Sequence, residues 1–68
     1  MDLLLFDYEM KKRGYTREKL AEAVGISRSA FYRKCTGKSE FTLAEIKEIA
    51  RVLQLTNVGD IFFADKVS

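Results

Sequence analysis

Histidine, proline and tryptophan are absent from this chain, and cysteine occurs once. A single Cys forms no internal disulfide. Without His, the chain assembles neither a His-containing zinc site nor a Cys-His nucleophile pair. A Gly-rich phosphate loop and carboxylates paired in a cleft are also missing. We therefore expect no enzyme, no metal, no cofactor and no small-molecule ligand, and the unpaired Cys fits a reducing cytoplasm.

Long hydrophobic runs are missing as well. The run LLLF at residues 3 to 6 is far too short to cross a bilayer. It is flanked by Asp2 and Asp7, where a secretory signal would be basic. The sequence therefore predicts a cytoplasmic protein with no targeting segment and no membrane partner.

The composition is that of a folded protein with one small core. The chain has 68 residues, of which 47% are hydrophobic and 32% charged. A chain of this length buries only about 60% of the surface that it exposes when unfolded. We expect a single domain over residues 1–68.

Positive charge is concentrated in the middle of the chain, although the net charge is only +2. Residues 11–39 hold nine Lys or Arg against Glu18 and Glu22, a local balance of +7, whereas the segments on both sides are acidic. A basic segment of this kind is typical of a surface that faces phosphates. The alternative is a solvated charged face without a ligand.

Two short helical patterns within residues 16–37 are separated by Gly25. Thr16 is a plausible N-cap of the first, and Ser27 of the second. Gly accepts a left-handed backbone without penalty, so it ends the first helix and allows a sharp turn. On the second helix, long polar side chains share one face and apolar side chains share the other. The polar face holds Arg28, Ser29, Tyr32 and Arg33, and the apolar face holds Ala30, Phe31 and Cys35.

Three further helices are expected on either side of this pair. A helix over residues 2–13 has an inward stripe of Leu3, Phe6 and Met10. Its basic last turn, Lys11, Lys12 and Arg13, either compensates the helix dipole or contacts the phosphates of a ligand. A helix beginning at the cap Thr42 has a Thr-x-x-Glu capping box with Glu45. Its predicted core face is Leu43, Ile46, Ile49, Ala50 and Leu53.

The fifth helix is expected within residues 55–63, with Asn57 as its cap. Ile61, Phe62 and Phe63 follow one another, and three consecutive apolar residues cannot all face inward on one helix. We expect at least one of them to be exposed and to contact a second subunit. The alternative is that this tail covers the core of the monomer.

Several local motifs resemble the Cro and phage-repressor family, also called XRE or lambda-repressor-like. These motifs are the small residue Ala21, the Gly25 that follows four residues later, and the capped helix after it. The segments RGYT, TGKSEFTLAEI and DIFF add to the resemblance. The resemblance covers roughly residues 4–63, and these segments are similar to those of small phage or prophage members. It implies an all-α, compact bundle of about five short helices, with the second and third forming a helix-turn-helix.

The resemblance also implies a function, that of a sequence-specific regulator of transcription bound to double-stranded DNA at the nucleoid. The third helix, about residues 27–36, would enter the major groove of a pseudo-palindromic operator as part of a homodimer and repress transcription. Its base-reading positions are Ser27, Arg28, Ser29, Tyr32 and Arg33. The phosphate-binding positions are Thr16, Arg17, Lys34 and Lys38.

Three positions depart from the family pattern. Arg17 stands where Gln is usual and offers donors only, so its expected role is a backbone contact. Thr36 stands where Asn is common. Lys34 lies among the packing residues of its helix, and either its stem follows Phe31 outward toward a phosphate or the helix register shifts by one near its end.

A protein-binding module that keeps the fold but not the DNA readout, such as an antirepressor or an antitoxin-like partner, is the alternative function. Arg28 and Arg33 argue against it, since a degenerate reading face would more often carry short or acidic residues. RNA is a weaker candidate, because the major groove of A-form RNA is too deep and narrow for this helix.

Overall fold

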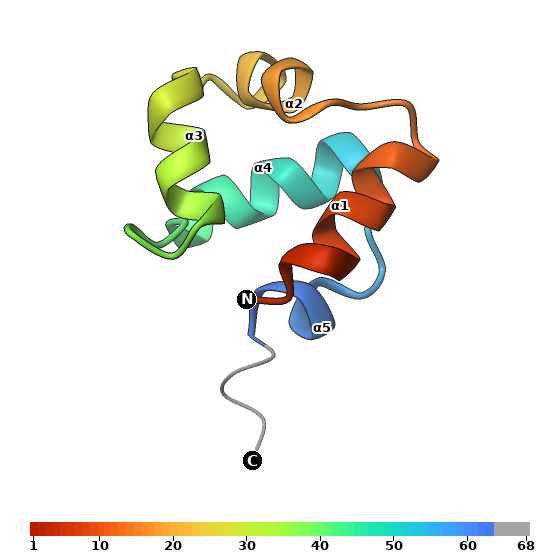
Figure 1. The fold of residues 1–68 in the computed structure, drawn as a ribbon. Coiled ribbons are helices and arrows are strands. Elements are labelled where there is room, and N and C mark those ends of the chain that lie inside the picture. The colour runs from red at the N-terminus through yellow and green to blue at the C-terminus, as the bar shows by residue number, and fades with distance from the viewer. Residues whose placement is uncertain (64–68) are drawn as a thin grey trace.

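The computed structural model describes residues 1–63, and this part of the chain contains five helices and no strand (Figure 1). They are α1 (Leu3–Lys12), α2 (Arg17–Val24), α3 (Arg28–Cys35), α4 (Leu43–Leu53) and α5 (Val58–Phe62). The all-α prediction is confirmed. Helix α2 packs against α3 and α4, while α5 packs against α1 and α4. The amide of Asp2 donates to the carbonyl of Ile61 at 2.7 Å, which ties the N-terminus to α5.

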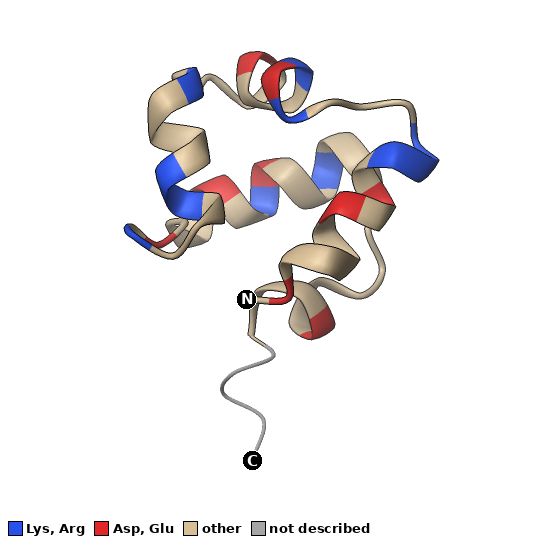
Figure 2. Ribbon diagram, viewed as in Figure 1, with Lys and Arg blue, Asp and Glu red and all other residues tan. Residues whose placement is uncertain are grey.

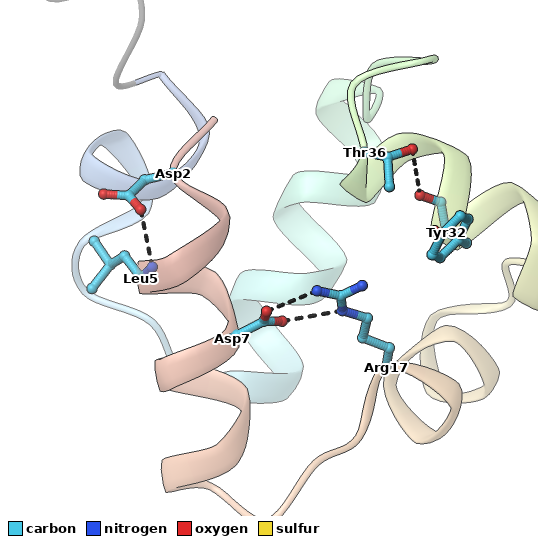
Figure 3. A network of polar contacts seen from close by, with 6 residues as sticks. All are labelled: Asp2, Leu5, Asp7, Arg17, Tyr32 and Thr36. Atoms are coloured by element: carbon cyan, nitrogen blue, oxygen red, sulfur yellow. Dashed lines mark hydrogen bonds and ion pairs between the residues drawn. The ribbon is translucent and has the colours of Figure 1, made fainter.

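Side-chain caps begin four of the five helices. The hydroxyl of Thr16 accepts from the Lys19 amide at 3.1 Å, and that of Ser27 accepts from the Ala30 amide at 3.2 Å. The capping box predicted at Thr42 forms with both of its hydrogen bonds. Asp2, a cap that the sequence did not reveal, accepts from the Leu5 amide at 3.0 Å (Figure 3).

Asn57 precedes α5 as predicted, but its side chain makes no capping hydrogen bond. Its amide nitrogen instead donates to Glu9 Oε2 at 3.5 Å. Glu9 is buried and also pairs with Arg13 one turn later. Asn57 therefore serves to join α1 to the start of α5 rather than to cap α5.

The turn between α2 and α3 forms at Gly25, whose φ is +75°. The Ile26 amide donates to the Ala21 carbonyl at 2.9 Å, which is the bond expected when a left-handed residue closes a helix. Ala21 is fully buried, and a small side chain there lets the two helices approach. This turn fixes the direction in which α3 leaves the body of the molecule.

Four phenylalanine rings hold α3 to the rest of the fold. Phe6 of α1 lies 5.3 Å from Phe62 of α5, and Phe31 of α3 lies 5.5 Å from Phe41, measured between ring centroids. Phe41 and Phe62 close the cluster at 5.6 Å in an edge-to-face arrangement, which aromatic pairs prefer. Because Phe31 lies on the buried side of α3, the opposite side of that helix is turned to solvent.

The prediction for Leu43 is wrong, and the three apolar residues at the end of α5 divide between the core and a partly exposed position. Leu43, assigned to the core face of α4, is the first residue of that helix and is 62% exposed, whereas Ile46 one turn later is buried. Ile61 and Phe62 are both buried in the monomer, and the helix ends at Phe62. Phe63 thus leaves the helical spacing and is half-buried. Ile61 and Phe62 thus cover the core of the monomer, while the contact with a second subunit stays a prediction.

Candidate nucleic-acid interface

The outer face of α3 carries the side chains predicted to read bases. Arg28, Ser29, Tyr32 and Arg33 are all exposed, whereas Phe31 and Cys35 are buried. Ser27, the cap, is exposed just before them. The division of α3 into a polar face and a packing face is therefore as predicted, and its register does not shift. Figure 2 shows Lys and Arg at both ends of α3.

Cys35 belongs to the packing face, where burial disfavours the thiolate form. Burial raises the pKa of its thiol to about 11, while the charge of Arg17 opposes that shift and Asp7 adds to it. At neutral pH the thiol is protonated and packs as a small apolar group.

A groove between α2 and α3 brings Arg17 beside the reading face. Its walls are formed by Arg17, Glu18, Arg28, Ser29, Phe31 and Tyr32. Three predicted base-reading residues and one predicted phosphate-binding residue thus share one surface. Arg33 lies outside the groove, further along α3.

Arg28 reaches across this groove to α2. Its Nη2 lies 3.2 Å from Glu18 Oε2, with the two side chains 78% and 62% exposed. Ion pairs this exposed contribute little to stability and are screened by salt. Arg28 can therefore exchange this pair easily for another acceptor.

Arg17 makes a stronger pair, with Asp7 of α1 (Figure 3). Its Nε lies 3.1 Å from Oδ1 and its Nη2 2.7 Å from Oδ2, which is the forked arrangement of guanidinium and carboxylate. The hydrogen bonds that Arg17 donates to Asp7 raise the pKa of Arg17, so its positive charge is secure. Arg17 is the first residue of α2, next to the cap Thr16, and it therefore lies beside the free amides of that helix end.

Lys34 does not follow Phe31 outward as predicted. Its Nζ lies 2.6 Å from Glu45 Oε1 and 5.9 Å from the centroid of the Phe41 ring, and its side chain is 15% exposed. The register of α3 is as expected, but the start of α4 folds over this position and supplies both partners. Burial raises the pKa of Glu45, while hydrogen bonds from Lys34 and Thr42 outweigh that effect and lower it.

Lys38 and Thr36 lie where α3 ends. Lys38 is exposed, and its amide donates to the Arg33 carbonyl at 2.9 Å after Gly37 turns the chain at a φ of +85°. The Thr36 hydroxyl donates to the Tyr32 carbonyl at 3.1 Å (Figure 3). It shares this hydrogen bond with the Arg33 carbonyl at 3.2 Å. Thr36 thus completes the helix end in place of the usual Asn.

Sequence reasoning missed the acidic partners Asp7, Glu18 and Glu45. Each lies ten or eleven positions along the chain from its cation, on a different helix. No local spacing rule links such residues, so only a knowledge of the packing could have revealed them. Their common effect is to fix or neutralise a cation near the reading face.

The predicted dimer residues lie on a separate surface. Phe63 lines a hollow together with Phe41, exposed Leu43 and Ile46 at the start of α4. Phe62 contributes to the floor, and Ile61 is fully buried away from it. A contact with a second subunit through this region would thus use Phe63 and Leu43. It would not use Ile61, Phe62 and Phe63 together.

Other kinds of site are not evident in residues 1–63. No group of three or more Cys, Asp or Glu side chains is arranged to hold a metal ion there. None of the helices in that range has the length and hydrophobicity needed to cross a bilayer.

Two short helices joined at Gly25, the second exposing a basic, polar face, define a helix-turn-helix DNA-binding unit. The sequence profile of the Cro/C1-type HTH DNA-binding domain matches residues 6–65, and the chain belongs to this family. The family resemblance seen in the sequence is confirmed, and DNA is the partner that the family implies. No curated protein and no solved structure was found to match the chain.

Proposed function

We propose that this protein is a transcriptional repressor that reads a specific operator with α3. The observation that carries the proposal is the shared surface on which Arg28, Ser29 and Tyr32 are exposed together, with Arg17 at its edge. The major groove admits an α-helix, and the long donors on the outer face of α3 suit contacts with base edges there.

Base recognition is assigned to Ser27, Arg28, Ser29, Tyr32 and Arg33. Arg28 and Arg33 each offer the planar fork that binds guanine O6 and N7. Arg28 gives up a weak, exposed pair with Glu18 to do so, and Arg33 makes no ion pair within residues 1–63. Ser27 and Ser29 reach polar edges, and Tyr32 reaches a methyl group or the backbone.

Phosphate binding is assigned to the start of α2 and the end of α3. The free amides beside Thr16 and the guanidinium of Arg17 bind one phosphate as donors, and the helix dipole favours its negative charge. Lys38 binds another phosphate. Lys34 is left out of this set, because its ammonium already lies on Glu45 and is largely covered.

Two copies of the chain bind one operator in this proposal. A two-fold dimer on one face of DNA requires half-site centres about 10 to 10.5 bp apart and a pseudo-palindromic sequence. The hollow that contains Phe63 and exposed Leu43 supplies apolar surface for a second copy. Packing of this surface against itself would bury a side chain that the monomer leaves in water.

A protein-binding role is the second candidate. Phe31 and the 58% exposed Tyr32 form an aromatic wall in the groove between α2 and α3, and aromatic side chains are enriched in protein interfaces. The same side chains serve DNA readout in the first proposal, so a binding experiment must decide between DNA and a protein as the partner.

Selection of bound sequences from random duplex DNA is that experiment. We expect a pseudo-palindrome, and affinity for it that falls more than tenfold between roughly 50 and 200 mM salt. Transcription from a promoter that overlaps the recovered site should fall when the protein is added. Recovery of no consensus, with a flat response to salt, would favour the protein-binding role.

A further inference from the structure

We propose that Asp7 of α1 is a positioning residue for DNA binding, because it holds Arg17 in the orientation in which Arg17 grips a phosphate. The inference rests on the proposed function and extends it to a helix outside the helix-turn-helix. Asp7 itself would touch no DNA.

The geometry of the ion pair leaves one edge of Arg17 free. A guanidinium has five N–H donors, and Asp7 occupies the Nε donor and one Nη2 donor. The donors on Nη1 and the second one on Nη2 remain, and Nη1 points away from Asp7 (Figure 3). That outer edge has the fork spacing that suits two oxygens of a phosphate.

The location of the pair supports the same conclusion. Arg17 borders the groove that also contains Arg28, Ser29 and Tyr32, so it shares a surface with three of the base-reading candidates. It is also the first residue of α2, where unpaired amides favour an anion. A phosphate bound at this helix end would therefore meet both the amides and the outer edge of Arg17.

The negative charge of Asp7 would weaken DNA binding if electrostatic repulsion were its only effect. A carboxylate close to a DNA backbone repels it, and the side chain of Asp7 is 40% exposed, so its charge is not hidden. The forked pair also contributes to the stability of the fold, and the Tm of Asp7→Asn measures that contribution separately. In addition, the pair restricts a long, flexible side chain before DNA arrives, which lowers the ordering cost of binding.

Repulsion and positioning predict opposite effects of Asp7→Asn on duplex affinity. If charge alone matters, Asp7→Asn removes a negative charge and strengthens binding to every duplex. If positioning matters, Asp7→Asn frees Arg17 to adopt other rotamers and weakens binding. Ordering one such side chain accounts for roughly a 2- to 10-fold loss in affinity.

The experiment measures duplex affinity of the full chain for the selected operator and for a scrambled duplex. Glu22→Gln is the matched control, since it removes an exposed charge on α2 that makes no ion pair within residues 1–63. We expect weaker binding to both duplexes for Asp7→Asn, and equal or stronger binding for Glu22→Gln. In an Arg17→Ala background, Asp7→Asn should cause no further loss, and Asp7→Glu should restore part of the wild-type affinity.

Three results would overturn the inference. Stronger binding by Asp7→Asn would show that its charge, not its hold on Arg17, is what matters. A loss that persists in the Arg17→Ala background, or a loss matched by a lower Tm, would show that Asp7 acts through the fold. Failure of the wild-type chain to bind any duplex would remove the proposed function, and the inference with it.

Discussion

The ammonium of Lys34, on α3, is anchored to Glu45 on α4 at 2.6 Å, and Glu45 at the same time accepts from the Thr42 amide at 2.8 Å. One carboxylate thus closes the capping box of α4 and holds the end of α3. The pair is mostly covered, with the side chains of Lys34 and Glu45 15% and 23% exposed. Lys34 is therefore part of the joint between the reading helix and the body of the molecule.

This joint predicts a stability phenotype for Lys34→Ala. The change removes a charged hydrogen bond and the contact with Phe41, and should lower the free energy of unfolding by about 1 to 2 kcal/mol. Thermal denaturation measures it as a Tm lower by several degrees. Lys47→Ala, on the exposed side of α4, is the control and should leave Tm nearly unchanged. Equal Tm values for the two variants, with a smaller salt slope for Lys34→Ala, would return Lys34 to the phosphate-binding set.

Base recognition by Arg33 and phosphate binding by Lys38 can be distinguished by mutation. Arg33→Ala should cost about 1 to 3 kcal/mol on the selected site and flatten preference at one base position, with little effect on non-specific binding. Lys38→Ala should weaken all duplexes by a similar factor and reduce the salt slope by about one unit. Titrations against the selected site and a scrambled duplex measure both. If Arg33→Ala weakens both duplexes equally, α3 is not inserted in the major groove as proposed.

Stability should fall in acid because of Glu9. The hydrogen bond from Arg13 is the main cause that lowers the pKa of Glu9 in the folded chain below its usual value of 4.5. The unfolded chain therefore takes up the proton more readily than the folded chain does. The stabilisation is present above about pH 4.5 and is lost as the pH falls through the folded pKa. We expect Tm to decline below that pH, and to decline less steeply in Glu9→Gln. Identical slopes for the two proteins would contradict the pairing.

Gly25→Ala should destabilise the helix-turn-helix through the backbone alone. A Cβ built at Gly25 meets no atom within 4 Å, but its φ is +75°, where an L side chain is strained by about 1 to 2 kcal/mol. Gly59→Ala is the matched control, since its Cβ also meets open space and its φ is not positive. Gly59→Ala should be neutral or stabilising by up to about 1 kcal/mol. Chemical denaturation of both variants gives the comparison, and a neutral Gly25→Ala would mean that another residue sets the turn.

Local patterns in the sequence determined the number and type of the helices. Thr16, Ser27 and Thr42 predicted three helix starts because a cap depends only on residues three positions apart. Gly25 predicted the turn because its requirement is a backbone angle. The two faces of α3 followed from helical spacing. The family resemblance rests on these same local features, which explains why it could be seen without a structure.

The tertiary structure decided which side chains meet. Asp7 and Arg17, like Lys34 and Glu45, lie on different helices, and nothing in their spacing along the chain indicates that they pair. The fate of Ile61, Phe62 and Phe63 depended on where α5 ends and on the space left by Phe6 and Phe41. Helix formation depends on near neighbours, whereas an ion pair or a burial depends on how whole helices pack. The role proposed for Asp7 therefore became visible only when α1 was placed beside the start of α2.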